Sequence, residues 1–406
     1  MLVGVDTQPK PLVKPQPHPL IGARSWAGGV ERALKGGRPL LRRWARARYF
    51  KGGLEDVPLE KVLLVACHWI GDTFWATQVV PALEAKLPAG ALHVATRGRS
   101  ADLWRGLVPS ERVRLLEHVV SDRQRESFRW GGLWSEAAAL RTEGFDLVLD
   151  LTGNRYSALL SFLARPRRAF GCGGGELARL YSRALPAPAP GTHLALRPWY
   201  AAAPLLGPPP LEVPLPQPLP VPLDLEGSLR GAVHALGVDP DDAFVVLAPG
   251  AGWSQKRWPT DRFALLAAQL EQSGLGVVAV GGPDEVALLE AVVARTERGR
   301  VVAGASLSRT ALLLDRARLV VANDSALGHL AAAQGVPLIS LFGPTNPACY
   351  RPLGRRVRVL RAGCSARPDG ADEHCHGRAA YPCPPSCWDA LTTARVLSAC
   401  RALLLG

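Results

Sequence analysis

Residues 320 to 347 read Val320-Val-Ala-Asn-Asp-Ser-Ala-Leu-Gly-His-Leu-Ala-Ala-Ala-Gln-Gly-Val-Pro-Leu-Ile-Ser-Leu-Phe-Gly-Pro-Thr-Asn-Pro347, with a polar cluster between two apolar runs. Residues 318–322 predict a buried strand, and residues 337–342 predict the next one. Between them, residues 327–334 predict a short helix with Ser325 as its N-cap. This order of strand, helix and strand predicts an α/β fold with a parallel sheet.

Three polar residues of this stretch, Asp324, Ser325 and His329, fall at the carboxyl end of the first strand. Ligands of doubly wound sheets bind at that end, where helix N-termini face anionic groups and a carboxylate can bind hydroxyls. The stretch therefore indicates a nucleotide-sugar site. A histidine such as His329 is more often a core residue than a ligand, but its place beside Asp324 also fits a phosphate or ribose contact.

The chain has 406 residues, which fits two domains of roughly 150 to 200 residues each. No apolar run approaches the roughly 18 residues that span a bilayer, and residues 1–20 lack the apolar core of a signal peptide. A cytoplasmic location is therefore expected.

The net charge of +13 is concentrated locally, because residues 35–51 carry seven basic side chains and no acidic one, interleaved with aromatic residues. A basic amphipathic helix with aromatics is typical of a membrane-surface segment, and such a helix can equally be a solvated one that docks on the first domain. No nucleic-acid recognition motif accompanies the charge, so no nucleic-acid partner is expected.

Four of the eight cysteines cluster with two histidines between residues 364 and 387. Cysteine and histidine are preferred zinc ligands, although their spacing matches no standard C-x2-C pair. The alternative is a proline-rich loop with free thiols or a facultative disulfide. The candidate zinc ligands are Cys364, Cys375, Cys383 and Cys387.

Strand and helix patterns alternate on both sides of a proline-rich segment. Nine of the nineteen residues from 204 to 222 are proline, which excludes a helix or a central strand and favours a stiff extended linker. We therefore expect a basic extension over 1–58, a Rossmann-like domain over 59–222 that ends in this linker, and a second Rossmann-like domain over 223–406. The simplest architecture has two parallel sheets that face an interdomain cleft.

In the first domain, residues 61–66 predict a strand and 74–87 a helix, with Gly71-Asp72 in the loop between them. Glycine lets the backbone turn tightly and approach a ligand, so Gly71 is a candidate donor contact. Asp72 has two interpretations: a plain helix cap, or a general base that takes the proton from an acceptor hydroxyl.

In the second domain, the loop Pro249-Gly-Ala-Gly-Trp-Ser-Gln-Lys-Arg-Trp-Pro-Thr260 precedes a helix. The backbone amides of Ala251 and Gly252, together with Lys256, could cradle a diphosphate. The loop is neither a Walker A nor a G-x-G-x-x-G motif, which argues against nucleotide hydrolysis and hydride transfer. Glu285, after Gly281-Gly-Pro-Asp, is a candidate for a ribose hydroxyl or a helix cap.

Taken together, these motifs resemble glycosyltransferase family 9, the heptosyltransferases of lipopolysaccharide core assembly. The resemblance runs from about residue 60 to 390 and rests on the motifs at 70–73, 146–154, 249–259, 281–285 and 323–345. It implies a GT-B fold, with an N-terminal acceptor domain, a C-terminal domain that binds an ADP-sugar, and inverting transfer without an essential metal.

Carried over by position, the resemblance makes Asp72 the catalytic base and Lys256 the cation that neutralises the diphosphate leaving group. Ala251 and Gly252 fall in the phosphate loop, and Glu285 falls near the ribose carboxylate. The donor-binding motif corresponds to Asp324, Ser325, Ala326, Leu327 and His329. The chain departs from the family at Ala326, usually glycine, at Gly328, often methionine, and at Trp69, commonly a basic or polar residue.

We therefore predict an inverting glycosyltransferase that moves a heptose from an ADP-linked donor to a lipid-linked glycan such as lipopolysaccharide core, without a cofactor. Residues 35–51 would hold the enzyme at the inner face of the cytoplasmic membrane. Two alternatives belong to other classes: a catalytically degenerate GT-B protein that binds or scaffolds, and a nicotinamide-dependent oxidoreductase, whose fingerprint these loops lack.

Overall fold

The computed structural model describes residues 54–117, 119–121, 126–128, 130–172, 177–189, 191–220, 229–239, 241–362 and 388–405. These residues belong to one compact unit that spans 48–406. The basic segment 35–51 and the cysteine cluster 364–387 lie outside the described residues. The predictions made for those two segments therefore remain predictions.

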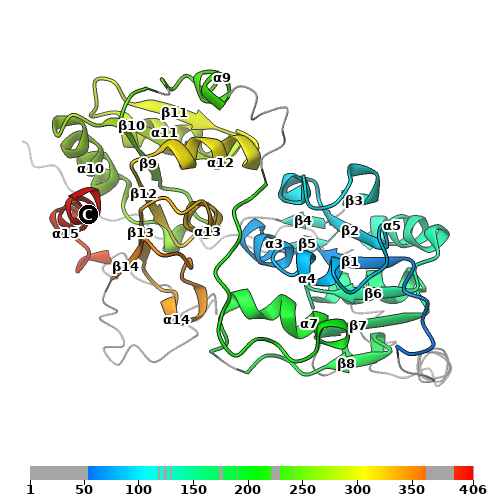
Figure 1. Cartoon of the computed structure of the whole chain (residues 1–406). Coiled ribbons are helices and arrows are strands. Elements are labelled where there is room, and N and C mark those ends of the chain that lie inside the picture. The colour runs from blue at the N-terminus through cyan, green and yellow to red at the C-terminus, as the bar shows by residue number, and fades with distance from the viewer. Residues whose placement is uncertain are drawn as a thin grey trace, which may run out of the picture. The chain divides into compact units, whose positions relative to one another are not determined.

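The first half of the described chain forms a six-stranded parallel sheet with the order β3-β2-β1-β6-β7-β8 (Figure 1). Every residue of the central strand β1 is buried, as its apolar sequence predicts. The strands are β1 Val62–Ala66, β2 Leu92–Arg97, β3 Val113–Leu116, β6 Leu147–Asp150, β7 Arg168–Cys172 and β8 Arg183–Leu185. A short antiparallel pair, β4 Val119–Ser121 and β5 Glu126–Phe128, lies between β3 and β6 in the sequence.

The second half repeats the same topology, with the order β11-β10-β9-β12-β13-β14 and every pairing parallel. Its central strands β9 and β12 are also buried throughout. The strands are β9 Phe244–Ala248, β10 Gly276–Gly281, β11 Arg300–Ala303, β12 Leu319–Asn323, β13 Leu338–Phe342 and β14 Val357–Arg361. Both sheets have the doubly wound order of Rossmann-like domains, so the predicted fold class is confirmed.

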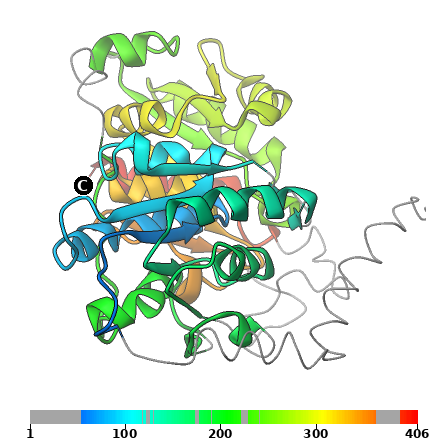
Figure 2. The same ribbon diagram turned by 90° about the vertical axis from the view of Figure 1, so that its right-hand side faces the viewer.

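Helices cover both faces of each sheet (Figure 1, Figure 2). In the first half they are α3 Ile70–Thr77, α4 Val80–Glu84, α5 Trp130–Glu143, α6 Arg155–Leu163 and α7 Arg197–Leu206. In the second half they are α9 Leu229–His234, α10 Thr260–Gln272, α11 Val286–Val293, α12 Leu307–Arg316, α13 Ala326–Ala333, α14 Pro347–Tyr350 and α15 Thr393–Leu405.

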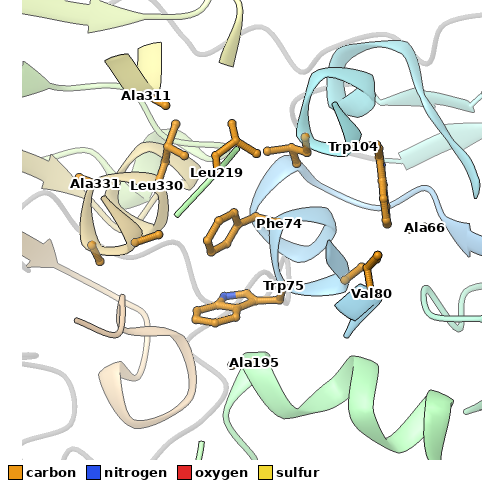
Figure 3. Packing of buried hydrophobic residues seen from close by; sticks show 14 of the residues in the cluster. Ala66, Phe74, Trp75, Val80, Trp104, Ala195, Leu219, Ala311, Leu330 and Ala331 are labelled. Carbon is orange, nitrogen blue, oxygen red and sulfur yellow. The ribbon is translucent and has the colours of Figure 1, made fainter. Parts of the chain in front are cut away.

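One apolar cluster joins the two halves (Figure 3). Phe74 and Trp75 of α3 are buried in it together with Leu330 and Ala331 of α13. Two further clusters fill the opposite faces of the first and second sheets. The apolar contact between α3 and α13 therefore places the start of α3 against the second half of the molecule.

Two helix predictions are corrected by the structure. The helix predicted over 74–87 begins at Ile70 and divides into α3 and α4, because Pro81 lacks the amide that would continue the hydrogen-bond ladder. The proline-rich segment was predicted to exclude helix from residue 204, yet α7 runs to Leu206 with Pro204 inside it. Residues 207–220 contain no helix or strand, as predicted for a linker.

The domain boundary after residue 222 stays a prediction, since residues 221–228 are not described. The two sheets do fall on either side of it, because β8 ends at Leu185 and β9 begins at Phe244. Within the described residues, no helix combines the length and the apolar character needed to cross a bilayer.

Candidate active site

The candidate site residues follow the strands at which each sheet reverses its order. In the first sheet the reversal lies between β1 and β6, and in the second it lies between β9 and β12. Ligands of open α/β sheets bind outside the carboxyl ends of the strands at such a point. His68 and Asp72 follow β1, whereas Lys256 follows β9 and Asp324 follows β12.

Asp72 lies in the first turn of α3, two residues after its first helical residue, and is not the N-cap. The N-cap is Trp69, whose side chain makes no capping hydrogen bond. The carboxylate of Asp72 instead contacts His68, with Oδ2 2.8 Å from Nδ1, and 26% of the side chain is exposed. A partly exposed carboxylate beside a histidine fits the base interpretation better than the plain cap.

The charges around Asp72 keep it ionised. Burial by itself raises the pKa of this carboxyl, but His68, Arg197 and Lys256 together hold it below the usual aspartate value. Lys256 belongs to the second half of the chain, so the field at the candidate base is set by both halves. An ionised carboxylate at neutral pH is able to accept a proton.

Lys256 ends the short 3-10 helix η5, Ser254–Lys256, and pairs with Asp324. Its Nζ lies 2.7 Å from Oδ2 of Asp324, and the two side chains are 17% and 5% exposed. The ammonium also lies 4.9 Å from the ring centre of Trp253 and 5.9 Å from that of Tyr350. The structure thus brings together two residues that are 68 positions apart in the sequence and that we predicted for one donor site.

Asn323 holds the loop that carries Lys256. Its side chain accepts a hydrogen bond from the amide of Trp258 at 3.0 Å and donates one to the carbonyl of Pro249 at 2.7 Å. Both ends of the 249–258 loop are therefore tied to the end of β12. Within this loop Ala251 is buried and Gly252 is exposed, so the amide of Gly252 lies where a diphosphate could approach it.

Glu285 lies beneath the same loop, in the 3-10 helix η6, Pro283–Glu285. Its Oε2 accepts a hydrogen bond from the amide of Gly282 at 2.9 Å, and its Oε1 lies 3.1 Å from the guanidinium of Arg257. A Cβ on Gly250 would clash with Oε2. Glu285 is the N-cap of α11, as the cap interpretation predicts, but its side chain bonds the start of η6 and not α11. Contact with a ribose remains a prediction.

Helix α13 begins at the candidate donor motif, and Ser325 is its N-cap, as predicted, although its side chain makes no capping hydrogen bond. Ala326 and Leu327 are half-buried in its first turn. Gly328 packs closely against Pro352, because a Cβ added at residue 328 would lie 3.3 Å from Pro352 Cγ. The position at which this chain has glycine and the family often has methionine is therefore tightly packed.

His329 is 4% exposed, and its ring meets that of Trp75 edge to face at 5.6 Å. Burial lowers the pKa of His329 to about 4, so the ring is neutral at physiological pH. An added Cβ on Gly71 would lie 3.5 Å from His329 Cδ2. These contacts match a core histidine at the junction of the two halves, while its role as a donor ligand stays a prediction.

A cavity of about 340 Å³ opens beside this centre. It lies at the carboxyl end of the first sheet, and Tyr350 and Cys349 close it from the second half. Arg197 lines the cavity and also lowers the pKa of Asp72, so the cavity and the carboxylate share one cation. Other lining residues are Thr152, Gly153 and Thr192.

Sequence reasoning missed several residues of this site. His68 could have been found from its spacing, because residues four positions apart lie on one face of a helix and His68 precedes Asp72 by four positions. His68 itself lies just before the helix. Arg197 and Tyr350 carried no local signal and reach the site only through the fold. Among the residues that the structure describes, no three His, Cys, Asp or Glu side chains are grouped to hold a metal ion.

Two doubly wound domains with candidate sites at their switch points have the architecture of the GT-B fold of glycosyltransferases. The chain belongs to glycosyltransferase family 9 (heptosyltransferase), whose sequence profile matches residues 133 to 377. The family resemblance is therefore confirmed.

Curated relatives and solved structures agree with this assignment. Lipopolysaccharide heptosyltransferase 2 of Escherichia coli K12 is 28% identical over 310 residues, which cover 74% of this chain and 88% of the relative. Lipopolysaccharide heptosyltransferase 1 of Pseudomonas aeruginosa is 32% identical over 178 residues, 41% of this chain and 50% of the relative.

The fold is similar to that of E. coli ADP-heptose lps heptosyltransferase II, with a TM-score of 0.68, 24% identity, and coverage of 85% of this chain and 98% of that one. It is also similar to E. coli heptosyltransferase WaaC with ADP, with a TM-score of 0.61, 23% identity, and coverage of 84% and 99%.

Proposed function

We propose that this protein transfers a heptose from an ADP-linked donor to a lipid-linked glycan of the lipopolysaccharide core, with inversion at the anomeric carbon. The observation that carries the proposal is the packing of α3, which bears Asp72, against α13, which begins just after Asp324, the ion-pair partner of Lys256. The curated relatives are lipopolysaccharide heptosyltransferases, and one similar structure was solved with ADP.

On the donor side, Lys256 supplies a fixed positive charge for the diphosphate. The exposed amide of Gly252 and the N-terminus of α13, at Ser325 to Leu327, supply hydrogen-bond donors that favour an anion. Asp324 orients the ammonium from 2.7 Å. Because this charge is built into the protein, we propose that transfer needs no metal ion.

On the acceptor side, the cavity of about 340 Å³ beside Arg197 holds the sugar that receives the heptose. Its size suits one sugar ring, and its threonine hydroxyls and guanidinium can bind sugar hydroxyls. Arg197 links the cavity to the candidate base, because it lines the cavity and its charge lowers the pKa of Asp72. The rest of a lipid-linked acceptor would extend outward from this ring.

The proposed reaction is a single displacement. Asp72 removes the proton from an acceptor hydroxyl as that oxygen bonds to the anomeric carbon. The bond from this carbon to the diphosphate breaks on the opposite face, and Lys256 stabilises the departing charge. Attack from the opposite face inverts the configuration, and the fixed charge of Lys256 stabilises the transition state.

The proposed location is the inner face of the cytoplasmic membrane, where a lipid-linked acceptor is accessible. Residues 35–51 would bind anionic lipid there, since each basic residue near such a surface gains about 1 kcal/mol. Vesicle co-sedimentation of the full chain, compared with a chain that lacks residues 1–53, tests this part of the proposal independently of catalysis.

Thermal shift with ADP-, GDP-, UDP- and dTDP-linked sugars tests the donor, and transfer to heptose-deficient lipopolysaccharide core tests the acceptor. A donor at about 100 times its Kd adds about 2.7 kcal/mol of stability. We expect the ADP-linked heptose to give the largest shift and to support transfer. Binding without transfer would favour a degenerate binding protein, and no shift with any donor would contradict the proposal.

A further inference from the structure

His68 is the side chain in direct contact with the candidate base, and the proposed function assigns it no role. It lies in the loop between β1 and α3, one turn ahead of Asp72, and its Nδ1 is 2.8 Å from Asp72 Oδ2. Its side chain is 29% exposed, so it is part of the site wall and not of the core.

The position of His68 is fixed by hydrogen bonds to the neighbouring strand. The amide of Cys67 donates to Thr152 Oγ1 at 2.9 Å. The amides of Thr152 and Gly153 both donate to Oδ1 of Asp150 at 2.9 Å. This buried carboxylate anchors the loop after β6, and that loop anchors the residue next to His68.

The other charges near Asp72 act differently. Arg197 on α7 and Lys256 on η5 lower the pKa of Asp72 by through-space attraction, and His329 on α13 is a neutral neighbour whose own pKa responds to Asp72. Asp324 offsets part of the Lys256 charge, since the two form an ion pair at 2.7 Å. A carboxylate without a fixed partner would be free to turn toward either cation.

We propose that His68 is a positioning residue for Asp72. Its imidazole, with Nδ1 2.8 Å from Oδ2, holds the carboxylate so that Oδ1 is left to accept the proton of the acceptor hydroxyl. This inference rests on the proposed function, because it assumes that Asp72 is the base. Geometry matters here, since a base must lie within about 2.6–3.2 Å of the proton donor, and a misplacement of about 1 Å can cost 10²-fold in rate.

The test compares His68→Ala with His68→Asn in a transfer assay with ADP-heptose. Alanine removes the contact, whereas the asparagine amide can donate a hydrogen bond from a position close to that of Nδ1 but cannot carry charge. We expect His68→Ala to lower kcat by about 10- to 100-fold, with an unchanged Kd for ADP. His68→Asn should recover most of the lost kcat.

The pH profile separates positioning from a structural effect. Removing His68 removes a group that lowers the pKa of Asp72, so that pKa rises and the acid limb of kcat/KM moves to higher pH. We expect this shift in both variants, since neither side chain can be protonated. In an Asp72→Asn background, His68→Ala should cost nothing further, because it acts through Asp72.

A kcat for His68→Ala within about twofold of the wild type, with an unmoved acid limb, would overturn the inference. A further loss in the Asp72→Asn background would also overturn it. If the wild type transfers heptose and Asp72→Asn does not, the proposed function stands whatever His68 does. If the wild type fails to transfer, the proposed function itself fails. Should His68→Ala not fold, the acid limb of His68→Asn decides, and an acid limb unmoved from that of the wild type would overturn the inference.

Discussion

Replacing Lys256 with methionine separates the catalytic role of this lysine from its structural role. The change keeps most of the side-chain volume and removes the charge, which leaves Asp324, 5% exposed, without its partner at 2.7 Å. Removing one partner of a buried ion pair costs about 3–5 kcal/mol. We expect about 3 kcal/mol, the lower end, because 17% of the lysine side chain is exposed.

The same substitution removes a fixed cation from the leaving group. Loss of one such electrostatic contact costs about 2.7–4 kcal/mol in the transition state, or 10²–10³ in kcat. The assay is transfer from ADP-heptose at saturating donor, together with urea unfolding. Lys86→Met is the matched control, since Lys86 is exposed and its loss changes the net charge equally. We expect the control to leave both quantities nearly unchanged.

Adding Asp324→Asn to Lys256→Met decides between the two roles. The double variant has no unpaired charge, so it should regain most of the lost free energy of unfolding. It should not regain turnover, because the cation is still missing. Recovery of kcat together with stability would refute the reasoning and assign Lys256 to structure alone.

Three further predictions concern the surroundings of the site. Burial lowers the pKa values of His193 and His329 from 6.5 to about 4, so the unfolded chain binds more protons than the folded chain between these pH values. The free energy of unfolding should therefore fall from pH 6.5 to pH 4 by up to about 3 kcal/mol for each histidine. Urea unfolding at several pH values checks this, and His329→Gln should flatten the pH dependence. An added Cβ on Gly71 would lie 3.5 Å from His329 Cδ2, so Gly71→Ala should be tolerated. Gly71→Val should cost about 1–3 kcal/mol by overpacking and should reduce transfer. Equal melting temperatures for the two variants would count against close packing of residue 71 on His329. Gly250→Ala would place its Cβ against Glu285 Oε2, so it should displace that carboxylate and weaken ADP binding in calorimetry, and Glu285→Gln should weaken it to a smaller extent. Unchanged affinity in both variants would remove Glu285 from the donor site.

The apolar periodicity of the sequence predicted the strands well, because buried parallel strands are continuous apolar runs. The predicted strands 61–66 and 243–248 differ from β1 and β9 by one residue at their start. The start of α3 was missed by four residues, since Gly71-Asp72 has the composition of a loop. The packing of α3 against α13 overrides that local preference.

Part of the candidate site could be predicted because strand ends of one parallel sheet meet at one edge. That rule placed Lys256 and Asp324 in one site, and in the structure their side chains lie 2.7 Å apart. It could not supply Arg197 and Tyr350, which approach the site from elements distant in the sequence. It also could not distinguish the buried ring of His329 from a ligand, because burial depends on Trp75 of the other half.

The central claim is that Asp72 removes the proton from the acceptor hydroxyl in a heptosyl transfer. The most direct measurement is the kcat of Asp72→Asn for transfer from ADP-heptose to heptose-deficient lipopolysaccharide core, with the Kd for ADP measured on the same sample. We predict a kcat about 10²- to 10⁴-fold below that of the wild type, with an ADP affinity within a few-fold. A variant that transfers heptose at the wild-type rate would contradict the claim.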